Sequence, residues 1–227
     1  MSAKNTTPAI GGSNAENLDE AKIRVRRDFK KITRAITSDD FEKLARTTPG
    51  LRVARIKVLP QYHPQFPAFP MPGVVTVVVV PEILAGASSL RPEPSKGFLQ
   101  TVRNHLKTKS LAATNLHVIE PEFVEVKVAA KIRTDARMSA ETVRGKVDEA
   151  IRKFLEPLNG GTDGKGWPFG RPVFKSEIYQ VIERVPGVAC VDSVALFGKS
   201  CDRMAQDKIT LRKIGLVYSG EHEIVVS

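Results

Sequence analysis

The feature of the sequence that most constrains the fold is a nearly unbroken apolar run, Val74–Val80, which contains six valines and one threonine. The run is rich in β-branched residues and too short for a typical helix, so it predicts a fully buried strand at the centre of a sheet. The segment just before it, Pro60–Pro72, holds five prolines in thirteen residues. Proline fixes φ and removes a hydrogen-bond donor, which predicts an exposed and fairly stiff loop rather than regular structure.

Amphipathic periodicity predicts helices on both sides of this strand. Apolar residues recur at intervals of three or four between Ala15 and Ala35, after a start marked by Asn14. A second helix is predicted from a Thr37 or Ser38 cap to about Thr48, and a third from Pro94-Ser95. The segment 51–59 alternates and predicts one further strand.

After Pro121 the pattern changes to alternation. Apolar residues occupy the even positions from Val124 to Ile132, and the opposite side carries Glu125, Lys127, Lys131 and Arg133, which predicts a strand with one buried face. Helices are predicted after caps at Ser139 and Ser176. Strands are predicted over 188–197, and one or two more over 208–218 and 223–226.

This order of elements predicts an α+β fold made of two small mixed α/β units. Each unit has a short sheet packed by amphipathic helices, and the two meet near Pro121. The predicted organisation is a flexible leader over 1–14, a first domain over 15–120 and a second domain over 121–227.

Composition places the chain among globular proteins. Hydrophobic residues make up 41% of 227 residues, and charged residues 26%. The two cysteines, Cys190 and Cys201, are too few for a disulfide framework, and no apolar run approaches a membrane span. These features predict a soluble, intracellular protein. The net charge of +10 fits nucleic acid, an anionic surface or an acidic protein partner.

The glycine-rich segment Asn159–Arg171 invites comparison with phosphate-binding loops but does not match them. A Walker loop requires glycine where Asn159 stands and a hydroxyl where Gly166 stands. In a dinucleotide fingerprint Gly170 would have to come one residue earlier. The glycines are better explained by a long turn that needs positive φ angles.

No other motif predicts catalysis. The four histidines are scattered, neither cysteine belongs to a CxxC pair, and no metal-ligand spacing is present. Cys190 lies in an apolar strand, and the Asp39-Asp40 pair suits a helix start. The sequence therefore predicts a non-enzymatic protein with no cofactor, no metal and no catalytic residue.

The first predicted helix carries the main candidate for nucleic-acid binding. A basic face opposes its apolar stripe, and the acid Asp28 interrupts it. Phosphate contacts from such a face would be strongly salt-dependent, but no recognised DNA- or RNA-binding motif accompanies it. A face that contacts solvent or protein is the favoured interpretation. The basic face consists of Lys22, Arg26, Arg27, Lys30 and Arg34.

One stretch resembles a known family. Phe154–Gly161, followed by Asp163-Gly164 and the hexapeptide Gly166-Trp167-Pro168-Phe169-Gly170-Arg171, is similar to the signature of the baseplate J-like family. Its members are baseplate assembly proteins of contractile-tailed phages and contractile injection systems. Arg34–Ala45, Pro72–Pro81, Pro121–Val126 and Val185–Val188 match other parts of the family pattern in the same order. The resemblance runs from about Gly11 to Phe197, and typical members are longer ahead of that point.

The resemblance implies a structural role. Family members are wedge proteins that assemble around the hub and spike, contact sheath-initiator proteins and other wedge subunits, and support the sheath. It implies assembly in the cytoplasm and then a place in the baseplate of a phage tail or injection particle. Nucleic acid is not an implied partner and no membrane span is implied.

The hexapeptide suits two structural roles. Trp167 and Phe169 can bury aromatic surface, Pro168 can stiffen the loop, and Arg171 offers a forked donor. These residues either hold the loop on its own domain or serve as hot spots at an interface. The candidate site for either role is Gly160, Gly161, Asp163, Gly164, Gly166, Trp167, Pro168, Phe169, Gly170 and Arg171.

Overall fold

The computed structural model describes residues 15–29, 32–83, 91–135, 138–198 and 206–226. The chain forms two compact units, Met1–Thr33 and Arg34–Ser227. The predicted leader over 1–14 lies outside the described residues.

The first unit contains helix α1, Leu18–Phe29. Its first turn is closed by a reciprocal pair, in which Glu20 N donates to Asn17 Oδ1 (2.8 Å) and Asn17 N donates to Glu20 Oε2 (3.1 Å). Asn17 therefore caps the helix, and the predicted start at Asn14 is wrong. The predicted extension to Ala35 is also wrong, because Ala35 forms a bridge with Ser110 in the second unit.

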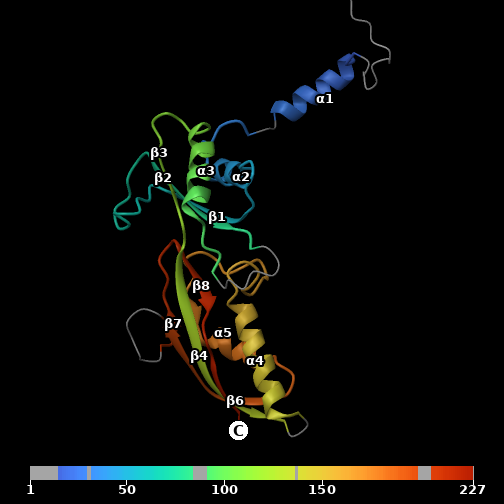
Figure 1. Ribbon diagram of the computed structural model, residues 1–227, viewed down its shortest axis with the longest axis vertical. Coiled ribbons are helices and arrows are strands. Elements are labelled where there is room, and N and C mark those ends of the chain that lie inside the picture. Colours follow the sequence, from blue (N-terminus) through green and yellow to red (C-terminus); the bar gives the residue numbers. More distant parts are fainter. Residues whose placement is uncertain (1–14, 30–31, 84–90, 136–137, 199–205, 227) are drawn as a thin grey trace, which may run out of the picture. The chain divides into compact units, whose positions relative to one another are not determined.

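The second unit begins with a three-stranded sheet that is packed by two helices (Figure 1). Its strands are β1 (Val53–Pro60), β2 (Val74–Pro81) and β3 (Asn115–Ile119), in the order β1-β2-β3. Strand β2 pairs antiparallel with β1 and parallel with β3. It is the buried central strand that the apolar run predicts. Strand β3 was not predicted.

The helices of this sheet are α2 (Ser38–Arg46) and α3 (Lys96–Lys107). Thr37 caps α2 in a reciprocal pair with Asp40, and Ser95 caps α3 by accepting from Phe98 N at 3.2 Å. Both starts confirm the predictions. Each cap hydroxyl accepts from an N–H of the first turn that has no acceptor within the helix.

A four-stranded sheet follows, built on the long strand β4 (Glu122–Thr134). Strand β6 (Val188–Gly198) pairs antiparallel with one edge of β4. Strands β8 (Gly215–Ser219) and β9 (Glu223–Val226) pair parallel with the other edge, one after the other. Two short strands, β5 (Val173–Phe174) and β7 (Lys208–Ile209), pair beside this sheet.

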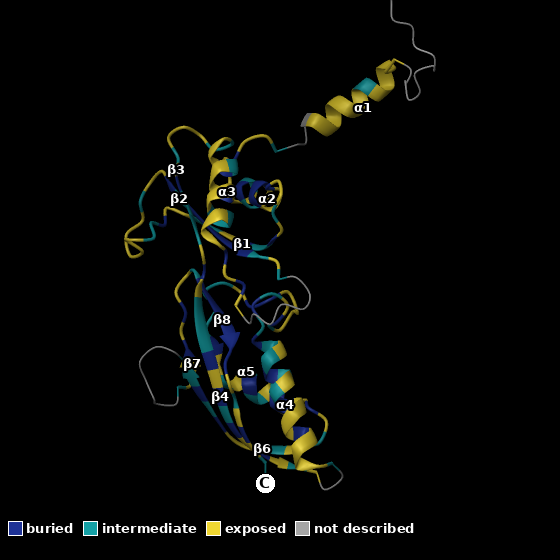
Figure 2. Ribbon diagram, viewed as in Figure 1, coloured by how far each residue is buried: buried dark blue, intermediate teal, exposed yellow. Residues whose placement is uncertain are grey.

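Helices α4 (Ala140–Phe154) and α5 (Lys175–Glu183) pack on this sheet and close its core. Their buried faces meet the inward side of β4, whose alternation is as predicted (Figure 2). Ser139 caps α4 as predicted. The prediction that Ser176 caps α5 is wrong, because Phe174 is the cap residue and its N–H donates to Glu177 Oε2 at 3.3 Å.

The predicted α+β class is confirmed, since short mixed sheets and amphipathic helices alternate along the chain. The predicted division into domains 15–120 and 121–227 stays a prediction, although Pro121 lies between β3 and β4. Within the described ranges, no helix has the length and apolar character that crossing a membrane requires.

Candidate functional site: the glycine-rich loop

The loop Asn159–Arg171 connects α4 to β5 and folds back on the end of α4. Gly160 N donates to Glu156 O at 3.0 Å, and Gly161 N donates to Phe154 O at 2.8 Å. A side chain at Gly160 would place its Cβ 2.5 Å from both of these carbonyl oxygens, so only glycine allows this close return. The glycines therefore shape a long turn, as the sequence indicates.

Several amide groups of the loop donate to main-chain oxygens of the protein itself. Gly166 N donates to Gly160 O at 2.9 Å, and Gly170 N donates to Gly215 O at 2.9 Å. A phosphate-binding loop needs such N–H groups to converge on the ligand. In this loop the amides of Gly166 and Gly170 instead close the turn and join it to Gly215 of β8.

Trp167 is the anchor of the loop. Its side chain is fully buried and belongs to the core formed by β4, α4 and α5. The indole Nε1 donates to the main-chain oxygen of Arg171 at 2.9 Å, and the ring meets Phe154 edge-on at 5.3 Å between centroids. Because no part of the indole is exposed, Trp167 holds the loop on its own chain and offers no surface to a partner.

Arg171 completes the inner part of the loop. Its guanidinium carbon lies 5.1 Å from the centre of the Trp167 ring, and its Nη2 forms an ion pair with Glu177 Oε1 on α5. The other carboxylate oxygen of Glu177 accepts from Phe174 N. Glu177 therefore joins the arginine of the hexapeptide to the start of the next helix.

Arg55 connects the loop to the first sheet, and sequence reasoning missed it. From β1, its Nη1 donates to Pro157 O at 2.6 Å and to Trp167 O at 2.5 Å. Its guanidinium carbon lies 5.0 Å from the centre of the half-buried Phe169 ring. Burial lowers the pKa of Arg55. No local signal distinguishes Arg55 from the other cations of its strand, since its partners lie more than 100 residues away.

The remaining residues of the candidate site form an exposed rim. Asp163, Gly164 and Pro168 are exposed, while Gly160, Gly166 and Trp167 are buried. The hydrogen bond from Gly166 N to Gly160 O closes the predicted site on itself, Arg55 contacts it at Trp167 and Phe169, and Asp163 and Gly164 are left in solvent. An interface role for the exposed rim stays a prediction.

The predicted basic face is divided between the two units. Lys22, Arg26 and Arg27 lie on α1, Arg34 lies in the second unit, and Lys30 lies outside the described residues. Acidic neighbours pair with cations of α1: Asp19 Oδ1 lies 3.2 Å from Lys22 Nζ, and the Glu16 carboxylate accepts two hydrogen bonds from Arg24. The hydrogen bond from Arg24 lowers the pKa of Glu16. These two acids precede Lys22, so Asp28 is still the only acid within residues 22–34, but the face is partly neutralised from its N-terminal side.

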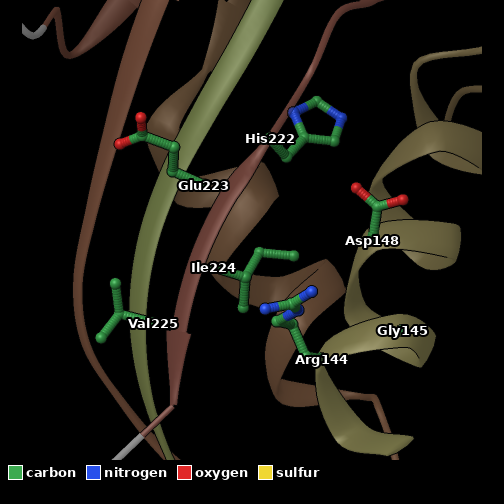
Figure 3. A pocket seen from close by; sticks show the side chains of 7 residues that line it. All are labelled: Arg144, Gly145, Asp148, His222, Glu223, Ile224 and Val225. Carbon is green, nitrogen blue, oxygen red and sulfur yellow. The ribbon is translucent and has the colours of Figure 1, made fainter. Parts of the chain in front are cut away.

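A pocket of about 550 Å³ lies between α4 and β9, and sequence reasoning missed it. Arg144, Gly145 and Asp148 line it from the helix, and His222 to Val225 line it from the strand side (Figure 3). His222 and Asp148 point toward one another across it. Within the described ranges, no three His, Cys, Asp or Glu side chains gather closely enough to hold a metal ion.

The histidine of this pocket lies beside a serine, but its hydrogen bonds do not suit nucleophilic catalysis. His222 Nδ1 accepts from Val128 N at 3.1 Å, so the neutral ring carries its proton on Nε2. That proton points at Ser219 Oγ, 2.8 Å away, and Ser219 Oγ donates to Gly220 O. A nucleophilic serine must instead donate to the histidine. The pair closes the short connection between β8 and β9.

The stability of the fold is expected to depend on the protonation of His222. Burial lowers its pKa to about 4, whereas an unfolded histidine titrates near ~6.5. Between these values the unfolded chain binds more protons, so stability rises with pH through this window and is lost as the pH falls.

The matched variant is His222→Asn, whose side-chain oxygen can still accept from Val128 N and which does not titrate. Between pH 7 and pH 4.5 we expect the wild-type melting temperature to fall a few degrees further than that of the variant. Parallel melting curves across the window would contradict this assignment of the protonation state.

The comparisons with known proteins point to one fold. No family model and no curated protein matches the sequence. Among solved structures, a chain in the cryo-EM structure of the anti-feeding prophage baseplate, six-fold symmetrised, matches with a TM-score of 0.60 and 17% sequence identity. The two chains share a fold. The match covers 93% of this chain and 43% of the other, so this chain spans less than half the length of its structural neighbour.

Proposed function

We propose that this chain is a non-enzymatic structural subunit of a baseplate, in a phage tail or a contractile injection system. The observation that carries the proposal is the fold that 93% of the chain shares with a chain from a prophage baseplate. The signature motif of the baseplate J-like family adds support, because its tryptophan and arginine are the residues that fix the loop to the core. Two independent features thus favour the same class of particle.

Within the baseplate, we propose the role of a wedge subunit. In this role the chain contacts other wedge subunits, sheath-initiator and hub or spike proteins, assembles in the cytoplasm and supports the sheath. The ion pairs and buried anchors of the second unit suit such a role, because a subunit under load needs its loops fixed to its core. A ring of wedges requires repeated contacts between neighbouring copies or between paralogues.

The direct test is to locate the chain in assembled particles. An epitope-tagged copy, produced with the neighbouring genes of its own genome, should co-purify with sheath and tube and label one end of the particle in electron micrographs. Particles that assemble normally and lack the tagged protein would contradict the baseplate role. A copy that carries the tag at the opposite end of the chain controls for a tag that blocks assembly.

The alternative is nucleic-acid binding through residues 22–34, and charge reversal separates the two functions. We expect Lys22→Glu, Arg26→Glu and Arg27→Glu together to lower particle yield at least about tenfold, because like charges brought together at a protein interface cost several kcal/mol. Retention of duplex DNA by the purified chain should not change. Particle counts and a filter-retention assay at several salt concentrations measure both.

The matched control reverses the exposed cations Lys96, Arg103 and Lys107 on α3, which changes the net charge equally. Tight, salt-sensitive DNA retention that the α1 variant loses and the α3 variant keeps would favour the nucleic-acid function instead.

A further inference from the structure

The loop Pro60–Pro72, between β1 and β2, differs in composition from the rest of the chain. Its thirteen residues contain no Asp, Glu, Lys or Arg, although these make up 26% of the sequence. Residues 65–70 are all exposed. Protein surfaces are usually kept hydrated by charged side chains, and this exposed segment has none.

The loop has a defined shape built from two consecutive turns. Phe66 N donates to His63 O at 3.1 Å, and Phe69 N donates to Phe66 O at 3.2 Å. Pro64 and Pro67 each occupy the second position of a turn, where their fixed φ favours this geometry. The conformation is therefore held before any partner is met.

Buried contacts fix the base of the loop to the first sheet. Tyr62 is 7% exposed, and its main-chain oxygen accepts from Thr76 Oγ1 at 2.5 Å. Met71 N donates to Gln61 O at 2.9 Å and closes the two arms of the loop. The turns are thus presented from a rigid support.

The tip exposes two large aromatic side chains. Phe66 is 50% exposed and Phe69 is 69% exposed. The His63 ring lies 5.3 Å from the Phe66 ring and 4.8 Å from the ring of His117, so Phe66 is braced on one side by the sheet. Aromatic side chains on a preorganised loop lose little conformational entropy on binding, which is the character of an interface anchor.

We propose that the loop Pro60–Pro72 is a docking element that inserts Phe66 and Phe69 into an uncharged, apolar pocket on another protein. The pocket is uncharged because the loop offers no ion to pair with a buried charge. A lipid surface is a poorer match, since the loop carries no Lys or Arg for anionic headgroups. The inference rests on the proposed function for one point: the partner is then a different subunit of the same particle.

The test replaces both anchors, Phe66→Ser with Phe69→Ser, and compares this variant with Leu111→Ser. Leu111 is 45% exposed in the connection between α3 and β3, so it controls for the loss of an exposed apolar side chain elsewhere. Thermal melting establishes that both variants keep the fold. In assembling particles, a photo-reactive benzoylphenylalanine at position 69 should cross-link the chain to one other subunit.

That subunit, once purified, should bind the wild-type chain and Leu111→Ser equally. It should bind the double variant at least about thirty-fold more weakly, which is the loss that defines one hot-spot residue. Equal binding and equal entry into particles by the double variant would overturn the docking role and leave the baseplate function intact.

Absence of the wild-type chain from every particle would instead overturn the baseplate function. In that case a cross-link from position 69 to one discrete protein that Phe66→Ser abolishes sustains the docking role, and the lack of any cross-link overturns it. Phe-dependent self-association in sedimentation, or Phe-dependent flotation with phosphatidylcholine–phosphatidylglycerol vesicles, would overturn the assignment of the partner as a different protein.

Discussion

Trp167→Ala is expected to lower the free energy of unfolding by about 3–5 kcal/mol, the range found when large buried aromatic side chains are removed from cores. The indole is 0% exposed and packs edge-on against Phe154. Its removal leaves a cavity at the end of α4 and leaves the main-chain oxygen of Arg171 without the Nε1 donor. Urea unfolding followed by circular dichroism measures the loss.

Two companion variants show how much of the lost stability comes from the Nε1 hydrogen bond and how much is specific to the fully buried ring. Trp167→Phe keeps an aromatic ring but lacks the donor, so its loss should be smaller than that of alanine. Phe169→Ala removes a half-buried ring that Arg55 covers, and it should also cost less. A Trp167→Ala chain that unfolds at the wild-type urea concentration would show that the loop is not an integral part of the core.

Arg55→Met is expected to lower the free energy of unfolding by about 2–4 kcal/mol, because hydrogen bonds from a charged donor contribute roughly 1.5–3 kcal/mol each and the loop can partly relax toward water. Two main-chain oxygens, those of Pro157 and Trp167, lose their shared donor. Methionine keeps an apolar stem over Phe169. The expected effect therefore measures the hydrogen bonds more than the packing.

Lys57→Met is the matched control, because Lys57 is exposed on the same strand. Its effect should fall within about 0.5 kcal/mol of zero, as for most surface substitutions. Hydrogen exchange adds a local readout: the amides of Gly161 and Gly166 should lose protection in Arg55→Met and keep it in Lys57→Met. Equal stability of the two variants would mean that the first sheet does not hold the loop.

Trp167 and Arg55 explain how the loop that contains the hexapeptide is held. Trp167 fixes the loop to the second sheet and its helices, and Arg55 fixes the same loop to the first sheet. In a baseplate subunit, such a double attachment would let load pass between the two sheets through the loop. The stability measurements test this double attachment directly.

Elements that depend on residues close together in the sequence could be predicted. The strand β2 follows from its run of valines, and β4 from alternation over Val124–Ile132. The caps at Thr37, Ser95 and Ser139 follow from a hydroxyl placed just before an apolar stripe. In each case the interactions that define the element lie within a few residues of one another.

Elements whose stability comes from distant partners could not be predicted. Strand β3 has five residues and no clear alternation, and it exists because the parallel edge of β2 accepts it. The start of α5 depends on Glu177, which also pairs with Arg171, and a serine in the first turn gave the wrong cap. Short elements of this kind gain most of their free energy from tertiary contacts.

The amino-acid sequence by itself determined the α+β class, the central strand, most helix starts and the glycine-rich turn, because periodicity, capping and positive φ are properties of neighbouring residues. Only the tertiary structure decided that Trp167 is buried, that Arg55 donates to Pro157 and Trp167, and that His222 accepts from Val128 N. Those contacts join residues separated by up to 112 positions. Which of several similar cations or histidines makes such a contact is settled by chain topology, which a local pattern does not encode.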